Sequence, residues 1–217
     1  MSQSEKFRHE GFSPLRLKAI IFDVGGVLIR THSRAGREKW AAKLGLAPWE
    51  FEEFVFSGES GRQAQMGQKT SATHWRWLGD YFQLPEAELT QMRRDFFAGD
   101  TINEPLVEHI KRLRLAGYRT GLLSNFTDSA RRVWTEVYPF IDYFDGIVIS
   151  AEVGLMKPDP KIYCLAAESV GVQVTEVLFV DDFAENIEGA KAVGMQTLHF
   201  TDPDAARQEL AAITGVE

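Results

Sequence analysis

Short, continuous apolar runs recur along this chain, separated by segments whose apolar residues repeat at spacings of three and four. The first run, residues 19–22, ends abruptly at Asp23 and is followed by Gly25 and Gly26. A run of this kind predicts a strand that is covered by helices on both faces, as in a parallel sheet. The two glycines allow the backbone to turn sharply and to approach a ligand closely. Asp23 is therefore either a carboxylate delivered to a strand tip or the N-cap of a following helix.

From residue 103 onward, strand-like runs alternate with stretches of helical period. Asn103 can cap the first of these helices, and Gly117 can end it in a left-handed turn. Later helices are expected to begin at the caps Asp128 and Asp159 and to end at Gly171 and Gly194. The expected strands cover residues 120–123, 147–150, 177–180 and 196–199. Strands that alternate with helices of about ten to fifteen residues imply right-handed crossovers, and so a doubly wound, parallel, Rossmann-like α/β sheet.

Residues 33–98 interrupt this alternation with a purely helical period and a concentration of Trp, Phe and Met. The spacing predicts four short amphipathic helices, with a loop at residues 57–61. The aromatic residues could line a substrate pocket, but packing of a small helical bundle is the preferred interpretation. We therefore expect an all-α cap inserted into one core domain. The expected division is a loose extension at 1–16, core at 17–32 and 99–217, and cap at 33–98.

Composition and charge restrict the partners. The 217 residues are 44% hydrophobic and 25% charged, which is typical of a globular protein. A formal charge of −7 gives no electrostatic footprint for nucleic acid or for an anionic membrane, and no apolar run approaches the roughly 18 residues of a membrane span. The single cysteine, Cys164, lies in an apolar segment, so we expect an inert core thiol in a reducing, cytoplasmic setting. Both a monomer and a homodimer are compatible with the sequence.

Polar residues gather where the expected strands end. Asp23, Ser124 and the pair Asp181 and Asp182 each follow a strand, and Lys157 lies in the loop after another. In an open parallel sheet these points share one edge, where strand ends and helix N-termini converge on a ligand. A carboxylate, a hydroxyl, an ammonium and further acids would suit a phosphate together with a cation. Taken singly, each residue has an ordinary alternative as a cap, a turn residue or a surface charge.

Four segments carry a resemblance to a known family: FDVGGVL, LLSN, GLMKPDPKIY and FVDDFAENIEGAKAVGM. Their order and spacing resemble the four motifs of the haloacid dehalogenase-like hydrolase superfamily, over residues 17–200. The helical insert resembles the cap of the phosphatase-like subgroup that includes the N-terminal domain of soluble epoxide hydrolase. Each motif alone is only moderately specific, so the resemblance depends on all four together.

The resemblance implies Mg²⁺-dependent phosphoryl transfer from a small phosphorylated molecule. Asp23 would attack phosphorus and form an aspartyl-phosphate. Asp182 and the main-chain carbonyl of Gly25 would join Asp23 around Mg²⁺, a hard cation that prefers oxygen ligands. The remaining groups would bind or orient: Ser124, Asn125 and Lys157 at the phosphoryl oxygens, with Asp181 and Asn186 behind them.

One position departs from the family's phosphatases. Their acid that protonates the leaving group stands two residues after the nucleophile, and here that residue is Gly25. General acid–base help is worth about 10²–10⁴ in rate. Three functions therefore stay open: a Mg²⁺-dependent phosphatase that is weak or relies on a substituted proton donor, a phosphate-binding or regulatory protein with little turnover, and a metal-independent 2-haloacid dehalogenase. The dehalogenase would have no use for the acidic pair after residue 180.

The choice of substrate would depend on cap side chains that face the site. Candidates are His32, Arg34, Arg37, Arg62 and His74. Most charged residues of such a cap are simply solvated, so each candidate also has an ordinary surface role.

Overall fold

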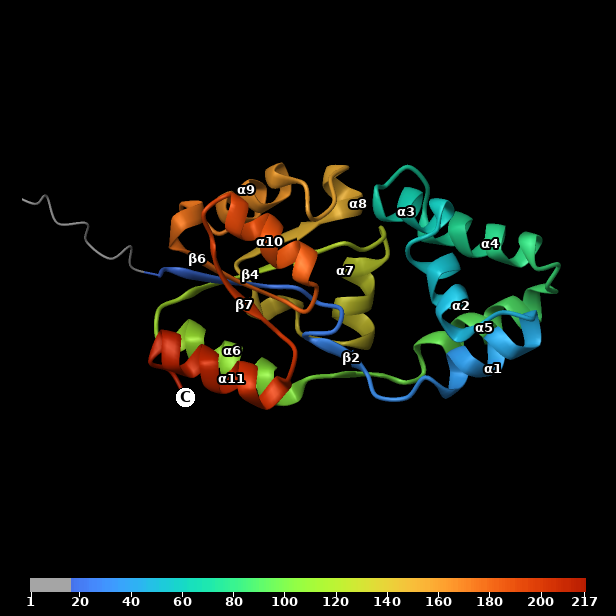
Figure 1. Cartoon of the computed structure of the whole chain (residues 1–217), viewed down its shortest axis with the longest axis horizontal. Coiled ribbons are helices and arrows are strands. Elements are labelled where there is room, and N and C mark those ends of the chain that lie inside the picture. Colours follow the sequence, from blue (N-terminus) through green and yellow to red (C-terminus); the bar gives the residue numbers. More distant parts are fainter. Residues whose placement is uncertain (1–16) are drawn as a thin grey trace, which may run out of the picture.

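The computed structural model describes residues 17–217, and the extension expected at 1–16 lies outside that range. The main sheet has five strands in the order β5-β4-β1-β6-β7, and every pairing in it is parallel. Its strands are β1 (Ala19–Phe22), β4 (Arg119–Ser124), β5 (Gly146–Ile149), β6 (Val177–Asp181) and β7 (Gln196–His199). Figure 1 shows helices on both faces of this sheet. The predicted doubly wound α/β fold is confirmed.

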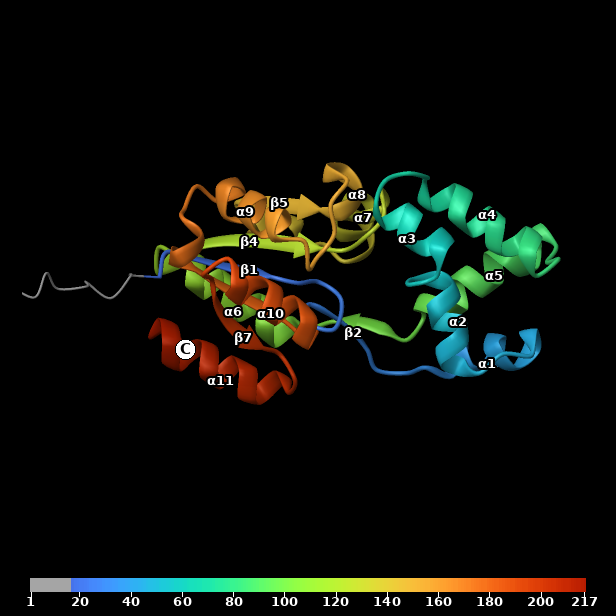
Figure 2. The ribbon, with the colours of Figure 1, turned by 45° about the horizontal axis from the view of Figure 1, so that its top comes forward.

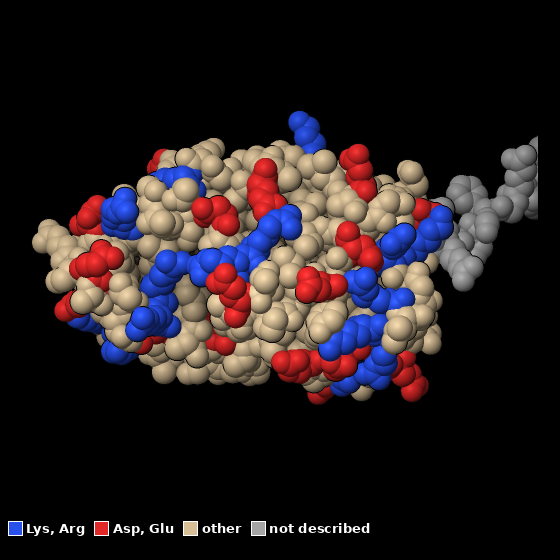
Figure 3. All heavy atoms as spheres, turned by 180° about the vertical axis from the view of Figure 1, so that it is seen from behind, with Lys and Arg blue, Asp and Glu red and all other residues tan. Residues whose placement is uncertain are grey.

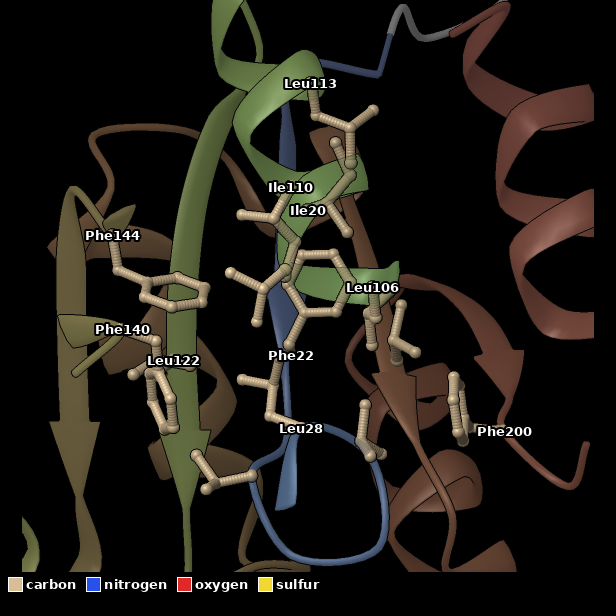
Figure 4. Packing of buried hydrophobic residues seen from close by; sticks show 14 of the residues in the cluster. Ile20, Phe22, Leu28, Leu106, Ile110, Leu113, Leu122, Phe140, Phe144 and Phe200 are labelled. Atoms are coloured by element: carbon tan, nitrogen blue, oxygen red, sulfur yellow. The ribbon is translucent and has the colours of Figure 1, made fainter. Parts of the chain in front are cut away.

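β1 is the central strand, and all four of its side chains are fully buried. Ile20 and Phe22 belong to the apolar cluster on one face, and Figure 4 shows them packed against the stripe of the first core helix. Ala19 and Ile21 belong to the cluster on the other face. The covering helices are α6 (Glu104–Leu115) and α11 (Pro203–Thr214) on the first face, and α9 (Pro160–Ser169) and α10 (Ala184–Ala192) on the second.

Most helix ends follow the local signals of the sequence. The Asn103 side chain accepts a hydrogen bond from the Leu106 N–H at 3.4 Å, and Asp159 accepts one from the Lys161 N–H at 2.9 Å. The predicted glycine stops all have positive φ: Gly117, Gly171 and Gly194. The C-terminal α11 was not among the predicted helices. Within residues 17–217, no helix combines the length and hydrophobicity needed to cross a bilayer.

Two expectations for the core were wrong. Asp128 does not cap the next helix, α7 (Ala130–Arg132), whose N-cap is Ser129. Its Oδ1 instead accepts the N–H of Ser71 in the cap, at 2.7 Å. Cys164 is exposed, because its neighbours on α9 are the residues that face the sheet. The short remaining core elements are η1 (Val133–Val137), η2 (Ile141–Tyr143), α8 (Ser150–Val153) and η3 (Val174–Glu176).

The insert contains five helices rather than the predicted four. They are α1 (Ala35–Leu44), α2 (Pro48–Val55), α3 (Glu59–Gln65), α4 (Ser71–Tyr81) and α5 (Glu86–Phe97). The additional helix is α3, which begins inside the segment predicted to be a loop. Its small residues are present for close packing, since a Cβ on Gly61 would lie 2.6 Å from the Phe56 carbonyl oxygen. Composition alone cannot distinguish such a tightly packed helix from a loop.

Aromatic side chains form the interior of this cap. Trp40, Phe51, Trp75 and Phe96 are at most 6% exposed and belong to one apolar cluster. The rings of Phe51 and Phe96 meet edge to face, with centroids 5.3 Å apart. The interpretation of the aromatic residues as bundle packing is therefore confirmed for these four.

A two-stranded stalk that the sequence pattern did not predict joins the cap to the core. It consists of β2 (Ile29–Thr31) and β3 (Asp100–Ile102), paired antiparallel. Arg37 of α1 is 5% exposed and binds both strands. Its Nη2 lies 2.9 Å from Asp100 Oδ1 and 3.0 Å from Thr31 Oγ1, and its Nε donates to the Phe96 carbonyl at 3.0 Å. Arg37, a candidate for substrate contact, is thus occupied in fixing the cap to its stalk.

We predict that Arg37→Met lowers the free energy of unfolding by about 3 to 5 kcal/mol, because it leaves the Asp100 carboxylate, which is only 10% exposed, without its cation. Lys43→Met is the matched control, since the Lys43–Glu88 ion pair is roughly half exposed on both sides and is worth under about 1 kcal/mol. Urea unfolding of both variants measures the difference. Equal losses of unfolding free energy in the two variants would show that Arg37 does not stabilise the attachment of the cap to its stalk.

Candidate active site

The carboxyl ends of three neighbouring strands bring the candidate residues to one edge of the sheet. β1 pairs with β4 up to Phe22 and Leu122, and with β6 up to Phe22 and Val180. Asp23, Ser124 and Asp181 therefore leave the sheet at nearly the same level. Figure 2 shows this edge facing the cap. The expectation that these strand tips share one edge is thus met by the strand register.

The turn after Asp23 depends on Gly26. This glycine has φ +74°, and a Cβ on it would lie 2.0 Å from Asp182 Oδ2. Only a glycine allows the backbone to pass so close to that carboxylate. Gly25, in contrast, has no positive φ and is exposed, and a Cβ there would meet no atom beyond its chain neighbours within 4 Å.

Lys157 is the centre of the charge arrangement. Its Nζ lies 2.8 Å from Asp23 Oδ1 and 2.6 Å from Asp181 Oδ2, and its side chain is 1% exposed. Asn125 holds the lysine backbone from both sides, because its Nδ2 donates to the Lys157 carbonyl at 3.0 Å and its Oδ1 accepts the Lys157 N–H at 2.8 Å. The structure therefore places Asn125 where it orients the lysine.

Asp181 is fully buried and its oxygens are already engaged. Besides Lys157, it accepts hydrogen bonds from the Phe183 N–H at 2.8 Å and from Asn186 Nδ2 at 3.0 and 3.1 Å. Tyr163 donates its hydroxyl to the Asn186 carbonyl at 2.9 Å. The sequence pattern alone predicts no role for Tyr163, although this residue ends the GLMKPDPKIY segment. Asp181 and Asn186 thus lie behind the site and fix its lysine.

Asp182 differs from Asp181 in having an oxygen without a partner. Its Oδ1 is buried and accepts no hydrogen bond from any described residue. One oxygen each from Asp23, Asp181 and Asp182 lie within 4.8 Å of one another. A buried carboxylate oxygen without a donor is rare and needs an explanation. This donor set fits a hard divalent cation, and Asp23 and Asp182 are the acids that remain available to it.

The pKa values show how strongly these charges interact. Burial raises the pKa of Asp23 to about 7, although Lys157 opposes the shift. Burial, followed by the charge of Asp181, raises the pKa of Asp182 to about 6. For Lys157, burial acts to lower the pKa, but Asp23 and Asp181 outweigh it and the pKa is raised. The three acids outnumber the one lysine, so the charge of this edge is compatible with a further cation.

The cap candidates divide into bonded and exposed residues. Arg34 pairs with Glu52, and His74 is buried between Ser60 Oγ and the Val55 carbonyl, at 3.0 Å from each. His32 and Arg62 are exposed. Among the sequence candidates in the cap, only these two exposed side chains lack a structural bond in the described residues.

Comparisons with known proteins show the family of this chain. The chain belongs to the haloacid dehalogenase-like hydrolases, whose family model matches residues 17–194. It is 29% identical to the pig bifunctional epoxide hydrolase 2 over 227 residues, covering 94% of this chain but only 40% of that protein. It is 30% identical to a D-ribitol-5-phosphate phosphatase of Bacteroides thetaiotaomicron over 207 residues, covering 91% of this chain and 98% of that enzyme.

A solved structure adds information on ligands. A haloacid dehalogenase-family enzyme of Bacteroides thetaiotaomicron, crystallised with magnesium and inorganic phosphate, superposes with a TM-score of 0.70 at 25% identity. The match covers 84% of this chain and 93% of that one. The chain is thus a member of a hydrolase family with phosphatases among its relatives, as the four motifs predicted.

We predict that the metal-free protein loses stability as the pH rises from about 5 to 8. The raised pKa values of Asp23 and Asp182, about 7 and about 6 against 3.8 in the unfolded chain, mean that the folded state binds more protons in this range. The protonated carboxyls favour folding most below about pH 4, and this contribution is lost as the pH passes through 6 and 7. Urea unfolding in EDTA measures the effect.

Asp23→Asn should remove much of this pH dependence, because an amide does not titrate. Asp204→Asn, at the exposed start of α11, is the control and should leave the dependence unchanged. If wild type and Asp23→Asn lost equal stability between pH 5 and 8, the raised pKa of Asp23 would be refuted.

Proposed function

We propose that this protein is a Mg²⁺-dependent phosphatase that acts on a small organic phosphate through a phosphoryl group carried on Asp23. One observation carries the proposal: a buried aspartate at a strand tip shares a lysine with a second aspartate and lies beside a third, Asp182, whose buried Oδ1 has no partner among the described residues. A structural ion pair would not need the third acid. Phosphoryl transfer needs a nucleophile, a cation site and a positive group near the phosphoryl oxygens.

The chain's own residues supply the groups for the first half of the reaction, and water completes the second. An oxygen of Asp23 attacks phosphorus as the bond to the leaving oxygen breaks, and the leaving oxygen keeps the electron pair. Water then attacks the aspartyl-phosphate, which releases inorganic phosphate and restores the carboxylate. Lys157 and the Ser124 hydroxyl bind phosphoryl oxygens, and Lys157 offsets their charge in the transition state. Mg²⁺, held by Asp23, Asp182 and the Gly25 carbonyl, would supply further charge neutralisation.

The leaving group determines how well this site works. Gly25 offers no proton donor, and the space around it is open, so no described side chain substitutes at that point. An aryl or acyl phosphate leaves as a stabilised anion and needs no proton, whereas an alkyl phosphate does. We therefore infer that the natural substrate has a good leaving group or carries its own proton donor.

A phosphate-binding protein with little turnover is the second candidate, and the missing acid at Gly25 is the observation that favours it. A metal-independent dehalogenase is less well supported. A buried carboxylate oxygen of Asp182 without a hydrogen-bond partner destabilises the fold, and an enzyme that binds no cation would not need it. Turnover of an aryl phosphate that depends on Mg²⁺ separates the phosphatase from both alternatives.

We predict that Asp23→Asn abolishes aryl phosphate turnover, since an amide is not a nucleophile for phosphorus. Asp182→Asn should keep measurable turnover but raise the required Mg²⁺ concentration by about tenfold or more. Steady-state rates across a Mg²⁺ titration distinguish the two effects. Full activity in Asp23→Asn would exclude Asp23 as the nucleophile.

We predict that Gly25→Asp raises alkyl phosphate turnover by about 10²–10⁴, with a much smaller gain on aryl phosphates. The structure permits the change, because Gly25 has no positive φ and its surroundings are open. Gly26→Ala is the matched contrast and should disrupt the site, since its Cβ would clash with Asp182. A folded, Mg²⁺-binding Gly25→Asp variant without this gain would show that the missing acid does not limit the rate.

A further inference from the structure

Asp182, one of the two acids available to a cation, is held by few contacts. Within residues 17–217, its only hydrogen bond with another residue is the one that its main-chain carbonyl accepts from His199 Nε2, at 2.9 Å. Asp23, in contrast, has an ion pair with Lys157 and a bond from its N–H to the Val180 carbonyl, at 2.8 Å each. His199 is therefore the residue whose hydrogen bond fixes the main chain of Asp182 beyond the end of β6.

The register of the sheet brings His199 to this point. β7 is an edge strand that pairs parallel with β6, and His199 lies opposite Asp181. Leu198 and Phe200, on either side of His199, belong to the apolar cluster under α6 and α11. Because successive side chains of a strand point to opposite faces, His199 faces the side of α10. Asp182 leads into α10, so its carbonyl lies within reach of the imidazole.

The bond extends the pairing of β6 and β7 by one residue. A main-chain bond runs from the Phe200 N–H to the Asp181 carbonyl at 2.8 Å. The next carbonyl, that of Asp182, accepts the imidazole of His199 instead of a main-chain N–H. A carbonyl oxygen only accepts, so Nε2 carries the proton in this contact. The His199 side chain thus takes the place of a further main-chain donor.

A role in folding alone explains this contact poorly. His199 is exposed at the tip of an edge strand, and a single hydrogen bond adds only modestly to the net stability of a fold. The carboxylate of Asp182 forms no hydrogen bond with another described residue, and its Oδ1 is buried. Gly26 lies close to its Oδ2. The orientation of this carboxylate is therefore set by packing and by its main chain, which His199 holds.

We propose that His199 is a positioning residue for the cation site: it holds the main chain of Asp182 so that the carboxylate stays directed to the cation that it shares with Asp23. This inference rests on the cation site of the proposed function but not on turnover. Groups that orient the ligands of a metal affect its affinity strongly, and their loss commonly costs about 10- to 100-fold. His199 would act in this way through a peptide carbonyl rather than through the carboxylate itself.

Divalent cations also bind loosely to surface carboxylates, and this background has to be separated from the site. The chain has a formal charge of −7, so some loose binding is expected. Among the described residues on the face that Figure 3 shows, acidic side chains lie beside Lys and Arg and form no continuous acidic area. Asp182→Asn, which removes a ligand of the site but no surface charge, is therefore the reference for this background.

Binding of Mn²⁺ tests the role directly, because Mn²⁺ favours the same oxygen ligands as Mg²⁺ and its free form is counted by electron paramagnetic resonance. His199→Phe keeps a flat ring that suits a strand but has no donor, and His199→Leu is a second variant without one. Both should raise the Mn²⁺ dissociation constant by about tenfold or more. His199→Gln, whose amide can donate to the Asp182 carbonyl, should stay close to wild type. Thr197→Val, on the same face of β7, is the matched control and should leave the constant unchanged.

The Mg²⁺ dependence of aryl phosphate turnover distinguishes positioning from a general loss of structure. At saturating Mg²⁺, His199→Phe and His199→Leu should approach the wild-type rate, whereas half of that rate should require about tenfold more Mg²⁺. Urea unfolding checks that each variant is folded, and either apolar variant alone is sufficient for the test.

Equal Mn²⁺ affinity in wild type and the apolar variants, or the same loss of affinity in His199→Gln as in them, would overturn the role of His199. Mg²⁺-dependent turnover with unchanged affinity in the apolar variants would leave the phosphatase standing and exclude the positioning role. Mn²⁺ binding that depends on the donor at residue 199, without any turnover, would do the reverse. If wild type binds Mn²⁺ no better than Asp182→Asn, both proposals fall.

Discussion

The ammonium of Lys157, buried between Asp23 and Asp181, is the interaction on which the candidate site depends. Removing these three charges from water is costly, and replacing such a pair with apolar residues is often neutral or stabilising. The arrangement is therefore poor evidence for a stabilising role and good evidence for a functional one. Its geometry is fixed from several sides: Asn125 holds the lysine backbone, and Asn186 with the Phe183 N–H holds Asp181.

The fold makes this arrangement possible because a parallel sheet delivers its strand ends to one edge. The fully buried β1 fixes the height of Asp23, and its pairing with β4 and β6 sets the levels of Ser124 and Asp181. The cap is then held over this edge at two places, by Arg37 at the stalk and by Asp128 at the start of α4. Both attachments are made by charged side chains. Their hydrogen bonds, and not only apolar packing, therefore fix the orientation of the cap on the core.

Local signals explain what the sequence could predict. The continuous run at residues 19–22, the caps Asn103 and Asp159 and the glycine stops each depend on a few neighbouring residues, and the structure has them as expected. The strand-tip residues could be placed at one edge for the same reason. The family resemblance of the four motifs added predicted roles for these residues that their chemical types alone left open.

The wrong or missing predictions have a different cause. Most of these features depend on contacts between residues that are far apart in the sequence. The stalk strands are only three residues long and pair across the whole cap. The sequence predicts Asp128 as a cap for its own helix, yet its side chain accepts the N–H of Ser71, the first residue of α4 in the insert. The small residues of α3 resemble a loop until their packing against Phe56 is known.

The central claim is that Asp23 carries the phosphoryl group, and the most direct measurement is to trap that group. The protein is mixed with an aryl phosphate and Mg²⁺, quenched in acid within the first turnover, and its peptides are analysed by mass spectrometry. We predict a phosphoryl adduct on Asp23 that forms at least as fast as turnover and persists, because Gly25 offers no base to activate water. Mg²⁺-dependent turnover without an adduct on Asp23, or with the adduct on another residue, would contradict the account.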